Sequence, residues 1–481
     1  MPIAPKAEIK FGTDGWRGIV ADDFTYDNVR RVAQGIADYL KDKRQGATPL
    51  AVVGYDCRFA SEEFAREVAR VFAGNGIKVL IFDRPSPTQV ASWTVIDRKA
   101  DGAAIITASH NPWLFNGVKY KPETGSSAPT EVIRDLERRI EDIDAASVKR
   151  ADEGVETYEP LPAYFEQVGR MVDLPALRGS GLKVLHECMF GSGYGYLSGL
   201  LAGGSTQVTE LHSERNPYFG GVNPEPIPRN LQSSLATMKS GGYDLCVATD
   251  GDADRVGIID EKGRFITQLE VYALLMLYLF EIKGWRGPVV KTVNMTSMAD
   301  QLAKEFKVPV YEVPVGFKFV APKMMETEAV LGGEESGVFG IRGLIPERDG
   351  LLAGLFFADM IVRYRKPISE VLADLQARVG PHAYERRDVP MRRETYDRDR
   401  QVILKTLAEK APKEVAGQKV ERVRDDDGFK FYLADGSWVL VRTSGTEPLI
   451  RIYSEAATKE DVTQRLDAMS EVIGVESHGG G

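Results

Sequence analysis

Short apolar runs alternate with helical patterns along most of the chain, and this alternation limits the possible folds more than any other feature. Near the start, PLAVVGYD indicates a strand, SEEFAREVARVFAGNG an amphipathic helix and IKVLIFD a second strand. Such spacing is typical of βαβ units, which build parallel sheets covered by helices. The sequence therefore predicts an α/β architecture.

Polar breaks interrupt this alternation at three places and predict domain boundaries near residues 155, 265 and 385. At ~150 residues per domain, a chain of 481 residues is expected to hold about three compact units. The last hundred residues differ, because KFYLADGSWVLVRTSG and LIRIYSEA indicate strands around a turn and KEDVTQRLDAMSEVI a closing helix. We therefore predict domains at 1–155, 156–265 and 266–384, followed by an α+β domain at 385–481.

Composition excludes several classes of function. A net charge of −9 and a pI near 5.4 are opposite in sign to the basic surface of a nucleic-acid binder. No segment approaches the ~20 apolar residues of a membrane span, and the N-terminus lacks a secretory pattern, so we expect a soluble cytoplasmic protein. Cys57, Cys188 and Cys246 lack CxxC spacing, which argues against disulfides or a zinc site, and we interpret Cys188 and Cys246 as buried thiols.

The segment TASHNPWLFNGVK follows an apolar run and brings Ser109, His110 and Asn111 together. Adjacent side chains on an extended backbone point to opposite faces, so Ser109 and His110 alone do not form a nucleophile and its base. The GxSxG elbow of α/β-hydrolases is also absent from this region. Taken alone, the segment is equally compatible with a strand that ends in a polar Asn-Pro turn.

The segment YDLCVATDGDADRVGIIDEKG places three carboxylates directly after a strand, at Asp250, Asp252 and Asp254. Their alternation lets one short loop direct all three towards one point, where their repulsion requires a hard cation such as Mg²⁺. A calcium loop of EF-hand type is the rival interpretation; it finds Glu261 at its twelfth position but Arg255 where it needs Gly. A solvated acidic turn is the other alternative.

The segment WVLVRTSGTEPLIRIYSEA joins two predicted strands through a polar turn. Its hydroxyls, its glycine and the guanidinium groups of Arg442 and Arg451 are suited to holding a phosphate. The same sequence is also compatible with an ordinary hairpin whose polar residues are solvated.

The segment AVLGGEESGVFG combines two glycines with Glu334 and Ser336. Glycines allow close backbone approach, and these two side chains are suited to bonding the hydroxyls of a sugar. The alternative is a Gly-rich turn with exposed acids.

Taken together, a hydroxyl nucleophile, a metal loop, a phosphate cradle and a sugar-binding loop indicate phosphoryl chemistry. The chain contains neither a Walker A loop nor the kinase signature set, so ATP is not expected to be the donor. The phosphoryl group then comes from the substrate or from the enzyme. A phosphoserine relay and a phosphatase both satisfy this condition.

Five segments, KFGTDGWRG, TASHNP, DGDADR, GGEESG and RTSGTEP, resemble in sequence and order the motifs of the α-D-phosphohexomutase superfamily. The resemblance covers essentially the whole chain. It implies three related α/β domains with mixed sheets around a cleft, followed by a C-terminal α+β lid domain. It also implies a small hexose phosphate as the partner, and a monomer or homodimer.

The resemblance further implies roles for individual residues. Ser109 would carry the phosphoryl group, and its phosphate would complete a Mg²⁺ site with Asp250, Asp252 and Asp254. Lys119 resembles the family's general acid/base, which requires its pKa to fall. The remaining implied residues are His110, Arg17 and Arg255 around the phosphoserine, Glu334, Ser336 and Lys318 at the sugar, and Arg442, Ser444, Gly445, Thr446 and Arg451 at the distal phosphate.

The implied reaction interconverts glucose 1-phosphate and glucose 6-phosphate through glucose 1,6-bisphosphate. The stretch VPVGFKFV resembles a Gly-Trp-Lys-Phe segment of phosphoglucomutases. Val338 stands where many bacterial members carry His, and Glu335 differs from the Gln typical of phosphoglucosamine mutases. We therefore favour glucose phosphate, with mannose phosphate or dual specificity as the main alternative. Phosphoglucosamine mutase, sugar phosphatase and catalytically silent sugar-phosphate binding are the weaker alternatives.

Overall fold

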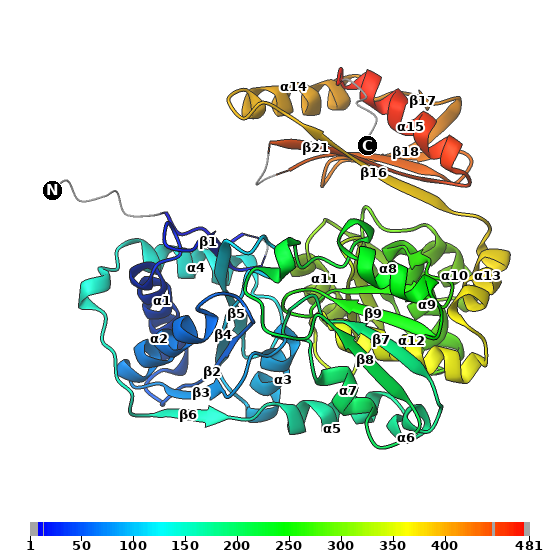
Figure 1. Ribbon diagram of the computed structural model, residues 1–481. Helices are drawn as coiled ribbons and strands as arrows, with labels where there is room; N and C mark the ends of the chain where they lie inside the picture. The colour runs from blue at the N-terminus through cyan, green and yellow to red at the C-terminus, as the bar shows by residue number, and fades with distance from the viewer. Residues whose placement is uncertain (1–7, 13, 445–447, 476–481) are drawn as a thin grey trace.

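Four sheets follow one another along the chain, three in α/β units and one in a C-terminal unit (Figure 1). The computed structural model describes residues 8–12, 14–444 and 448–475. Mixed sheets in the first three units and an antiparallel sheet with helices in the fourth confirm the predicted fold class. None of the helices in these ranges is long and apolar enough to cross a membrane.

The first sheet is six-stranded, in the order β1-β5-β4-β2-β3-β6. Its central strands are continuous apolar runs that are buried on both faces, as expected where helices cover a parallel core. Its strands are β1 (Trp16–Ile19), β2 (Leu50–Tyr55), β3 (Lys78–Phe82), β4 (Gly102–Ile106), β5 (Phe115–Pro122) and β6 (Val155–Tyr158). Its helices are α1 (Tyr26–Arg44), α2 (Ser61–Gly74), α3 (Thr88–Arg98) and α4 (Thr130–Glu141).

The second sheet has five strands, in the order β11-β10-β9-β7-β8, and the third has four, in the order β13-β12-β14-β15. The strands of the second are β7 (Lys183–Glu187), β8 (Gln207–Leu211), β9 (Leu245–Thr249), β10 (Val256–Asp260) and β11 (Phe265–Ile266), and those of the third are β12 (Val289–Thr292), β13 (Val310–Val313), β14 (Leu331–Glu334) and β15 (Val338–Ile341). The helices of this region are α5 (Leu161–Met171), α6 (Leu174–Arg178), α7 (Tyr196–Leu201), α8 (Gln232–Lys239), α9 (Gln268–Glu281), α10 (Met298–Phe306), α11 (Phe317–Thr327), α12 (Gly350–Tyr364) and α13 (Ile368–Val379).

These three sheets share one topology. In each, two strands joined by a helical crossover pair in parallel, as β2 with β3, β7 with β8 and β12 with β13 do. A third strand then pairs in parallel with the first of the two, as β4, β9 and β14 do. The chain next turns back antiparallel through the hairpins β4–β5, β9–β10 and β14–β15. The alternation of apolar runs and helical patterns therefore restarts after each polar break because one fold is repeated.

The fourth sheet is antiparallel, in the order β16-β21-β20-β19-β18-β17, and lies above the other units in the view of Figure 1. Its strands are β16 (Ala383–Pro390), β17 (Glu414–Val415), β18 (Gln418–Arg424), β19 (Phe429–Leu433), β20 (Trp438–Thr443) and β21 (Leu449–Ala456), and its helices α14 (Tyr396–Glu409) and α15 (Lys459–Val472). The hydrophobic core of this unit, which includes Leu407, Phe431 and Leu466, is separate from the core of the first three units.

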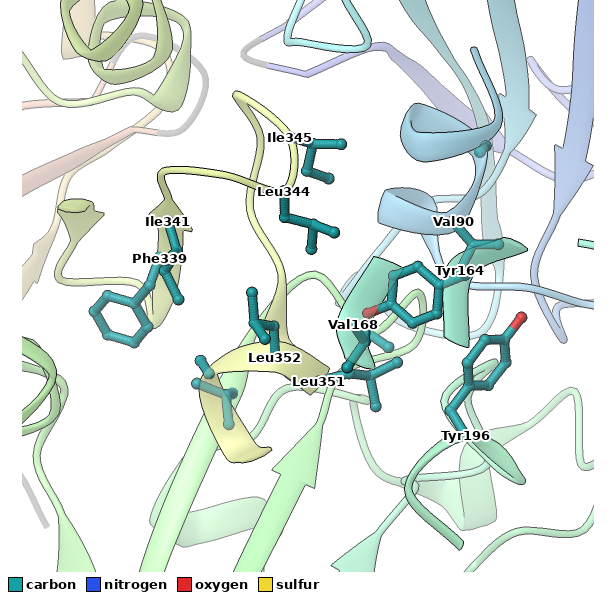
Figure 2. Packing of buried hydrophobic residues seen from close by; sticks show 14 of the residues in the cluster. Val90, Tyr164, Val168, Tyr196, Phe339, Ile341, Leu344, Ile345, Leu351 and Leu352 are labelled. Carbon is teal, nitrogen blue, oxygen red and sulfur yellow. The ribbon is translucent and has the colours of Figure 1, made fainter. Parts of the chain in front are cut away.

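One large core extends through the first three units, beside smaller clusters in the second and third units. Figure 2 shows Val90 of α3 and Tyr164 of α5 in the same cluster as Phe339 of β15 and Leu351 of α12. Tyr164 also makes an edge contact with the ring of Tyr196 of α7, with ring centroids 5.9 Å apart. Burial of these large side chains stabilises the fold by roughly 1.5–3 kcal/mol each. The packing therefore joins the three sheets into one body.

Asp349 lies at the junction of these units and caps α12. Its Oδ1 accepts from the backbone N–H of Leu352 at 2.9 Å, and its Oδ2 from the hydroxyl of Tyr164 at 2.8 Å. Burial raises the pKa of Asp349 to about 6, although these hydrogen bonds partly oppose the rise. The folded protein therefore binds the Asp349 proton more tightly than the unfolded chain does.

This shift predicts a pH effect on stability. The raised pKa contributes stability that is present below the ordinary pKa of aspartate and is lost as the pH rises through about 6, a contribution on the order of 3 kcal/mol. The uncharged Asp349→Asn variant removes this dependence. Its melting temperature relative to the parent protein should therefore rise by on the order of 5 °C between pH 4.5 and pH 8 in thermal scans. A constant difference between variant and parent across this range would contradict the assignment.

Candidate active site

The turns of the three equivalent hairpins hold the three polar motifs singled out in the sequence. The β4–β5 turn carries Ser109, the β9–β10 turn spans residues 250–255, and the β14–β15 turn follows Glu334. The first two turns touch each other, because a Cβ at Gly251 would lie 2.5 Å from the backbone oxygen of Ser109. Glycine at position 251 therefore allows loops from different units to meet, which no local pattern predicts.

Ser109 is buried, and its backbone is held in the left-handed region at φ 51°. Its N–H donates to the Thr107 hydroxyl at 2.9 Å, and its carbonyl accepts from the Arg58 guanidinium at 2.5 Å. The hydroxyl donates to Oδ2 of Asp250 at 2.8 Å. A non-glycine residue in this conformation requires support, and these contacts provide it. The serine hydroxyl therefore faces the acidic loop.

Asp250, Asp252 and Asp254 gather their carboxylates at one point. One oxygen from each lies within 4.8 Å of the others, and all three residues are buried. Burial and the two neighbouring carboxylates raise the pKa of Asp250 well above its ordinary value. Oδ1 of Asp252 is buried and has no hydrogen-bond partner within the described residues. A buried all-oxygen set with an unsatisfied atom fits a hard divalent cation such as Mg²⁺.

Lys119 of β5 lies among carboxylates instead of cations. Its Nζ is 2.7 Å from Oδ2 of Asp252 and 2.8 Å from Oδ2 of both Asp254 and Asp14. Burial alone would lower the pKa of Lys119, but these three carboxylates outweigh burial and raise it. The expected fall in its pKa is therefore wrong for this arrangement, because the sequence did not show that the aspartates would surround the ammonium group.

A second set of buried charges supports the site, and the sequence analysis missed it. Arg348 pairs with Asp14 and lies 3.0 Å from Oδ2 of Asp254. Lys121 pairs with Glu347 at 2.5 Å and with Asp14 at 3.2 Å. Asp14 belongs to the segment KFGTDGWRG, which is one of the motifs that carry the resemblance. The polar turn that holds Glu347 and Arg348 belongs to none of the motifs identified in the sequence.

His110 lies beside Ser109, and Arg17 and Arg255 reach the serine loop through Asn111 and His110; the roles that the resemblance implies for them stay predictions. The Oγ of Ser109 lies 3.3 Å from Nδ1 of His110, whose Nε2 lies 3.5 Å from Nη2 of Arg255. The expectation that Ser109 and His110 point to opposite faces is therefore wrong, because the backbone at Ser109 is left-handed and not extended. Arg17 reaches the same loop by donating to the side chain of Asn111. Burial lowers the pKa of His110 well below its ordinary value, and the nearby guanidinium groups add to this effect. The imidazole is therefore neutral at physiological pH.

The GGEESG segment forms the end of β14 and the turn after it. Glu334 is buried, accepts from the N–H of Gly316 at 2.7 Å and has its pKa raised by burial. Ser336 is half-buried in the turn, and Val338 is buried in β15. Lys318 lies in the first turn of α11, with its ammonium 5.4 Å from the centre of the Phe319 ring. The bond from Gly316 thus joins the VPVGFKFV stretch to the sugar-binding segment.

The described residues that were expected to form a phosphate cradle in the last unit lie at the end of β20 and on β21. Arg442 donates through Nε to Asp427 at 2.9 Å, and Arg451 lies 3.8 Å from Asp388. Ser444 is buried, and its carbonyl accepts from the Tyr396 hydroxyl at 2.5 Å. Gly445 and Thr446 lie outside the described residues. Asp427 also accepts from the N–H of Val315 at 2.6 Å, which brings Arg442 towards the third unit.

Charged side chains connect the fourth unit to the third. Glu312 of β13 pairs with Lys430 at 2.9 Å and with Arg424 at 3.2 Å. Glu455 of β21 accepts from the N–H and the hydroxyl of Ser297, each at 2.7 Å. These contacts hold the cradle on the side of the molecule where Glu334 lies, since the Arg442 charge also acts on that carboxyl.

The assembled geometry can hold a phosphorylated hydroxyl beside a divalent cation. A serine oxygen faces three carboxylates, a buried ammonium lies behind them, and guanidinium groups flank the serine loop. Such positioning and charge are what phosphoryl transfer requires. The EF-hand alternative does not fit, because strands flank the loop and the Glu261 carboxylate bonds Ser369 instead of turning towards the aspartates.

Comparisons with known proteins agree with this geometry. Family models of phosphoglucomutase/phosphomannomutase match in order: α/β/α domain I over residues 8–147, domain II over 162–263, domain III over 269–379 and the C-terminal domain over 401–472.

Individual relatives match along nearly their whole length. A "Phosphoglucomutase/phosphomannomutase" of Thermococcus kodakarensis is 31% identical over 460 residues, which is 95% of this chain and 96% of that protein. A "Probable phosphoglucosamine mutase" of Methanopyrus kandleri is 29% identical over 468 residues, covering 96% and 97%. A solved structure from Thermus thermophilus, assigned as a phosphomannomutase, is 35% identical with a TM-score of 0.86, covering 98% and 100% of the two chains.

Proposed function

Because the chain belongs to the phosphoglucomutase/phosphomannomutase family, we propose that it interconverts glucose 1-phosphate and glucose 6-phosphate through a phosphoserine at Ser109. The observation that carries this proposal is the 2.8 Å contact between the Ser109 hydroxyl and Asp250, beside Asp252 and Asp254. The two ends of a hexose are too far apart for direct transfer. A relay through the enzyme and glucose 1,6-bisphosphate solves this problem.

In the first half-reaction, the bond between phosphorus and Oγ of phosphorylated Ser109 breaks, and phosphorus bonds to the O6 hydroxyl of glucose 1-phosphate. The hydroxyl proton needs an acceptor, and the serine oxygen needs a proton as it leaves. In the balanced step the O6 proton passes to the serine oxygen, and His110, which is neutral with its Nδ1 3.3 Å from Oγ, is suited to exchange a proton with that oxygen. Lys119 is protonated among its carboxylates, which suits it to donate one.

In the second half-reaction, glucose 1,6-bisphosphate reverses its orientation, and its 1-phosphoryl group returns to Oγ of Ser109. Glucose 6-phosphate and the phosphoenzyme are then restored. Glu334 and Ser336 bond the sugar hydroxyls, with Lys318 beside them. The distal phosphate is held by Arg442, Ser444, Gly445, Thr446 and Arg451. Arg17 and Arg255 offset the charge on the reacting phosphoryl group.

Mg²⁺ fits the acidic loop, where Asp250, Asp252, Asp254 and the Ser109 phosphate would hold it. When bound, this ion supplies positive charge against the phosphoryl oxygens. Removing divalent cations with EDTA is therefore expected to lower turnover at least ~10³-fold, and added Mg²⁺ should restore it. The rate of glucose 6-phosphate formation measures both effects. Unchanged turnover after dialysis against EDTA would exclude a metal requirement.

The proposal also names the sugar of the substrate. The VPVGFKFV stretch, joined to Glu334 by the N–H of Gly316, supports glucose. Mannose phosphate is the second candidate, because relatives carry both names. Glucosamine phosphate is the third, because the Methanopyrus kandleri relative is named for it. In this chain Glu335 lies 3.4 Å from Arg386, so its charge is not free to attract an amino group.

The deciding experiment compares the 1-phosphates of glucose, mannose and glucosamine, with Mg²⁺ and with or without a trace of glucose 1,6-bisphosphate. Free phosphate is recorded in the same samples. We expect isomerisation that is fastest with glucose, is stimulated by the bisphosphate and releases no phosphate. A faster rate with another sugar would reassign the substrate, and phosphate release without isomerisation would indicate a phosphatase.

We also propose small changes to the domain boundaries. The positions 155 and 265 are the first residues of β6 and β11, which pair with the sheets that precede them. Position 385 lies inside β16, which pairs with β21 of the last sheet. Boundaries after Tyr158 and Ile266 and before Ala383 would keep each sheet whole.

A further inference from the structure

His186, Cys188 and Glu210 form a second cluster of potential metal ligands in the second unit, apart from the acidic loop. His186 on β7 and Glu210 on β8 are direct partners in the parallel ladder, so their side chains share one face of the sheet. Cys188 follows His186 by two positions. One nitrogen, one sulfur and one oxygen from the three side chains lie within 4.8 Å of one another.

The spacing of these atoms is compatible with a shared metal ion, and the pair His186 and Glu210 is too far apart for a direct hydrogen bond. Nδ1 of His186 is 3.5 Å from Sγ of Cys188 and 3.6 Å from Oε1 of Glu210. An N–H···O bond is normally ~2.9 Å long, so the pair with Glu210 is too far apart for one. With zinc bonds of ~2.0–2.1 Å to nitrogen and oxygen and ~2.3 Å to sulfur, tetrahedral ligands lie ~3.4–3.6 Å apart.

The surroundings orient two of the three ligands, His186 and Glu210, in the way that metal sites require. Nε2 of His186 lies 3.2 Å from the Thr249 hydroxyl, so a proton there leaves the Nδ1 lone pair facing Cys188 and Glu210. Oε1 of Glu210 accepts from the N–H of Gly195 at 2.8 Å and from the hydroxyl of Ser198 at 2.9 Å. These bonds hold the Glu210 carboxylate in place.

The cluster is enclosed but reachable. His186 and Cys188 are fully buried, whereas the Glu210 side chain keeps 17% of its surface exposed. Nothing in the proposed mutase reaction uses these three residues. Cysteine spacing alone argued against zinc, because the third ligand comes from a neighbouring strand and the pair His186 and Cys188 does not form a CxxC pattern.

We propose that His186, Cys188 and Glu210 bind a divalent transition metal ion of the zinc type, with solvent at the fourth position. The mixed nitrogen, sulfur and oxygen set favours such an ion over Mg²⁺. The site adjoins the catalytic loop, because Thr249 directly precedes Asp250. A bound ion therefore fixes the imidazole that contacts the end of β9. This proposal does not rest on the mutase assignment.

Cobalt is a suitable probe, because Co²⁺ occupies zinc sites and a cobalt–thiolate bond absorbs in the near ultraviolet. The full chain is titrated with Co²⁺ in excess Mg²⁺, which keeps the all-oxygen loop occupied by the harder ion. We expect the charge-transfer band to saturate at one equivalent and to disappear when Zn²⁺ is added. Absence of the band in the unmodified protein would overturn the proposal.

Matched variants identify the ligands. Cys188→Ser should abolish the band, whereas Cys246→Ser should retain it, because Cys246 is equally buried in the same unit but belongs to a different cluster. Glu210→Gln should keep the thiolate band and weaken Co²⁺ binding at least ~10-fold. Unchanged affinity in Glu210→Gln, or loss of the band in Cys246→Ser, would overturn the assignment even if Cys188→Ser fails to fold.

A second readout is thermal stability. A ligand that binds only the folded state raises the melting temperature, and the stabilisation grows with the logarithm of its concentration relative to the dissociation constant. In excess Mg²⁺, Zn²⁺ should raise the melting temperature of the parent protein and of Cys246→Ser by several degrees, and raise that of Glu210→Gln by less at the same concentration. An equal rise in all three would place the zinc elsewhere and overturn the proposal.

Discussion

Replacing Ser109 with alanine is expected to lower mutase turnover by at least ~10⁴-fold, because the variant lacks the oxygen that carries the phosphoryl group. The fold should persist. The substitution removes one hydroxyl, while the backbone bonds to Thr107 and Arg58 remain. Binding of glucose 1-phosphate should also remain, because in the proposed binding mode its sugar and distal phosphate contact other loops.

The measurement combines steady-state kinetics, phosphate labelling and calorimetric binding of glucose 1-phosphate. Ser92→Ala is the matched control: Ser92 is buried in the same unit, and its hydroxyl has no hydrogen-bond partner among the residues described. We expect the control to keep parental turnover and its label at Ser109. Turnover in Ser109→Ala within ten-fold of the parent protein would eliminate the phosphoserine relay.

Replacing Lys119 with methionine is expected to damage both stability and turnover. The parent ammonium is buried against Asp14, Asp252 and Asp254, all within 2.8 Å. Removing one side of a buried ion pair costs about 3–5 kcal/mol, which lowers the melting temperature by on the order of 10 °C. Loss of a proton donor and of positive charge should lower turnover by ~10²–10⁴-fold.

Magnesium gives this prediction a distinctive signature. The variant leaves carboxylates without their ammonium partner, so a divalent cation should raise its melting temperature more than it raises that of the parent protein. Lys121→Met is the matched control, because Lys121 is equally buried two positions along β5 but pairs with Asp14 and Glu347 instead of the acidic loop. We expect the control to lose stability without this extra response to Mg²⁺. Equal responses of both variants would contradict the assigned role of Lys119.

Much of the fold could be predicted from sequence, because apolar periodicity reports burial directly. PLAVVGYD, IKVLIFD and GAAIITAS became β2, β3 and β4, and the helix between the first two became α2. The antiparallel hairpins that repeat in each α/β unit were less visible. The second strand of each hairpin follows a short polar turn, and the sequence of such a turn, as at residues 107–114, is also typical of a surface loop.

The site was only partly accessible to sequence reasoning. The aspartates alternate within one loop, so local geometry was enough to bring them together. Lys119 was identified but its electrostatic state was not, because its partners come from segments far apart in the chain. Arg348 was missed for the same reason, since its contact with Asp14 spans 334 positions. Ion pairs between residues that are far apart in the chain leave no periodic pattern in the sequence.

The separate core of the C-terminal unit has a thermodynamic consequence. Most of its apolar residues pack among themselves, whereas Trp438, Leu440 and Tyr453 form a smaller cluster with Val293 of the third unit, beside ion pairs such as that of Glu312 with Lys430. Cooperativity in unfolding follows shared packing, so the molecule contains at least two cooperative units. A calorimeter should resolve two melting transitions. A ligand that bridges Arg442 and the serine loop would bring the two melting temperatures closer together. The difference between them would then measure how much of the protein has bound ligand, without any turnover.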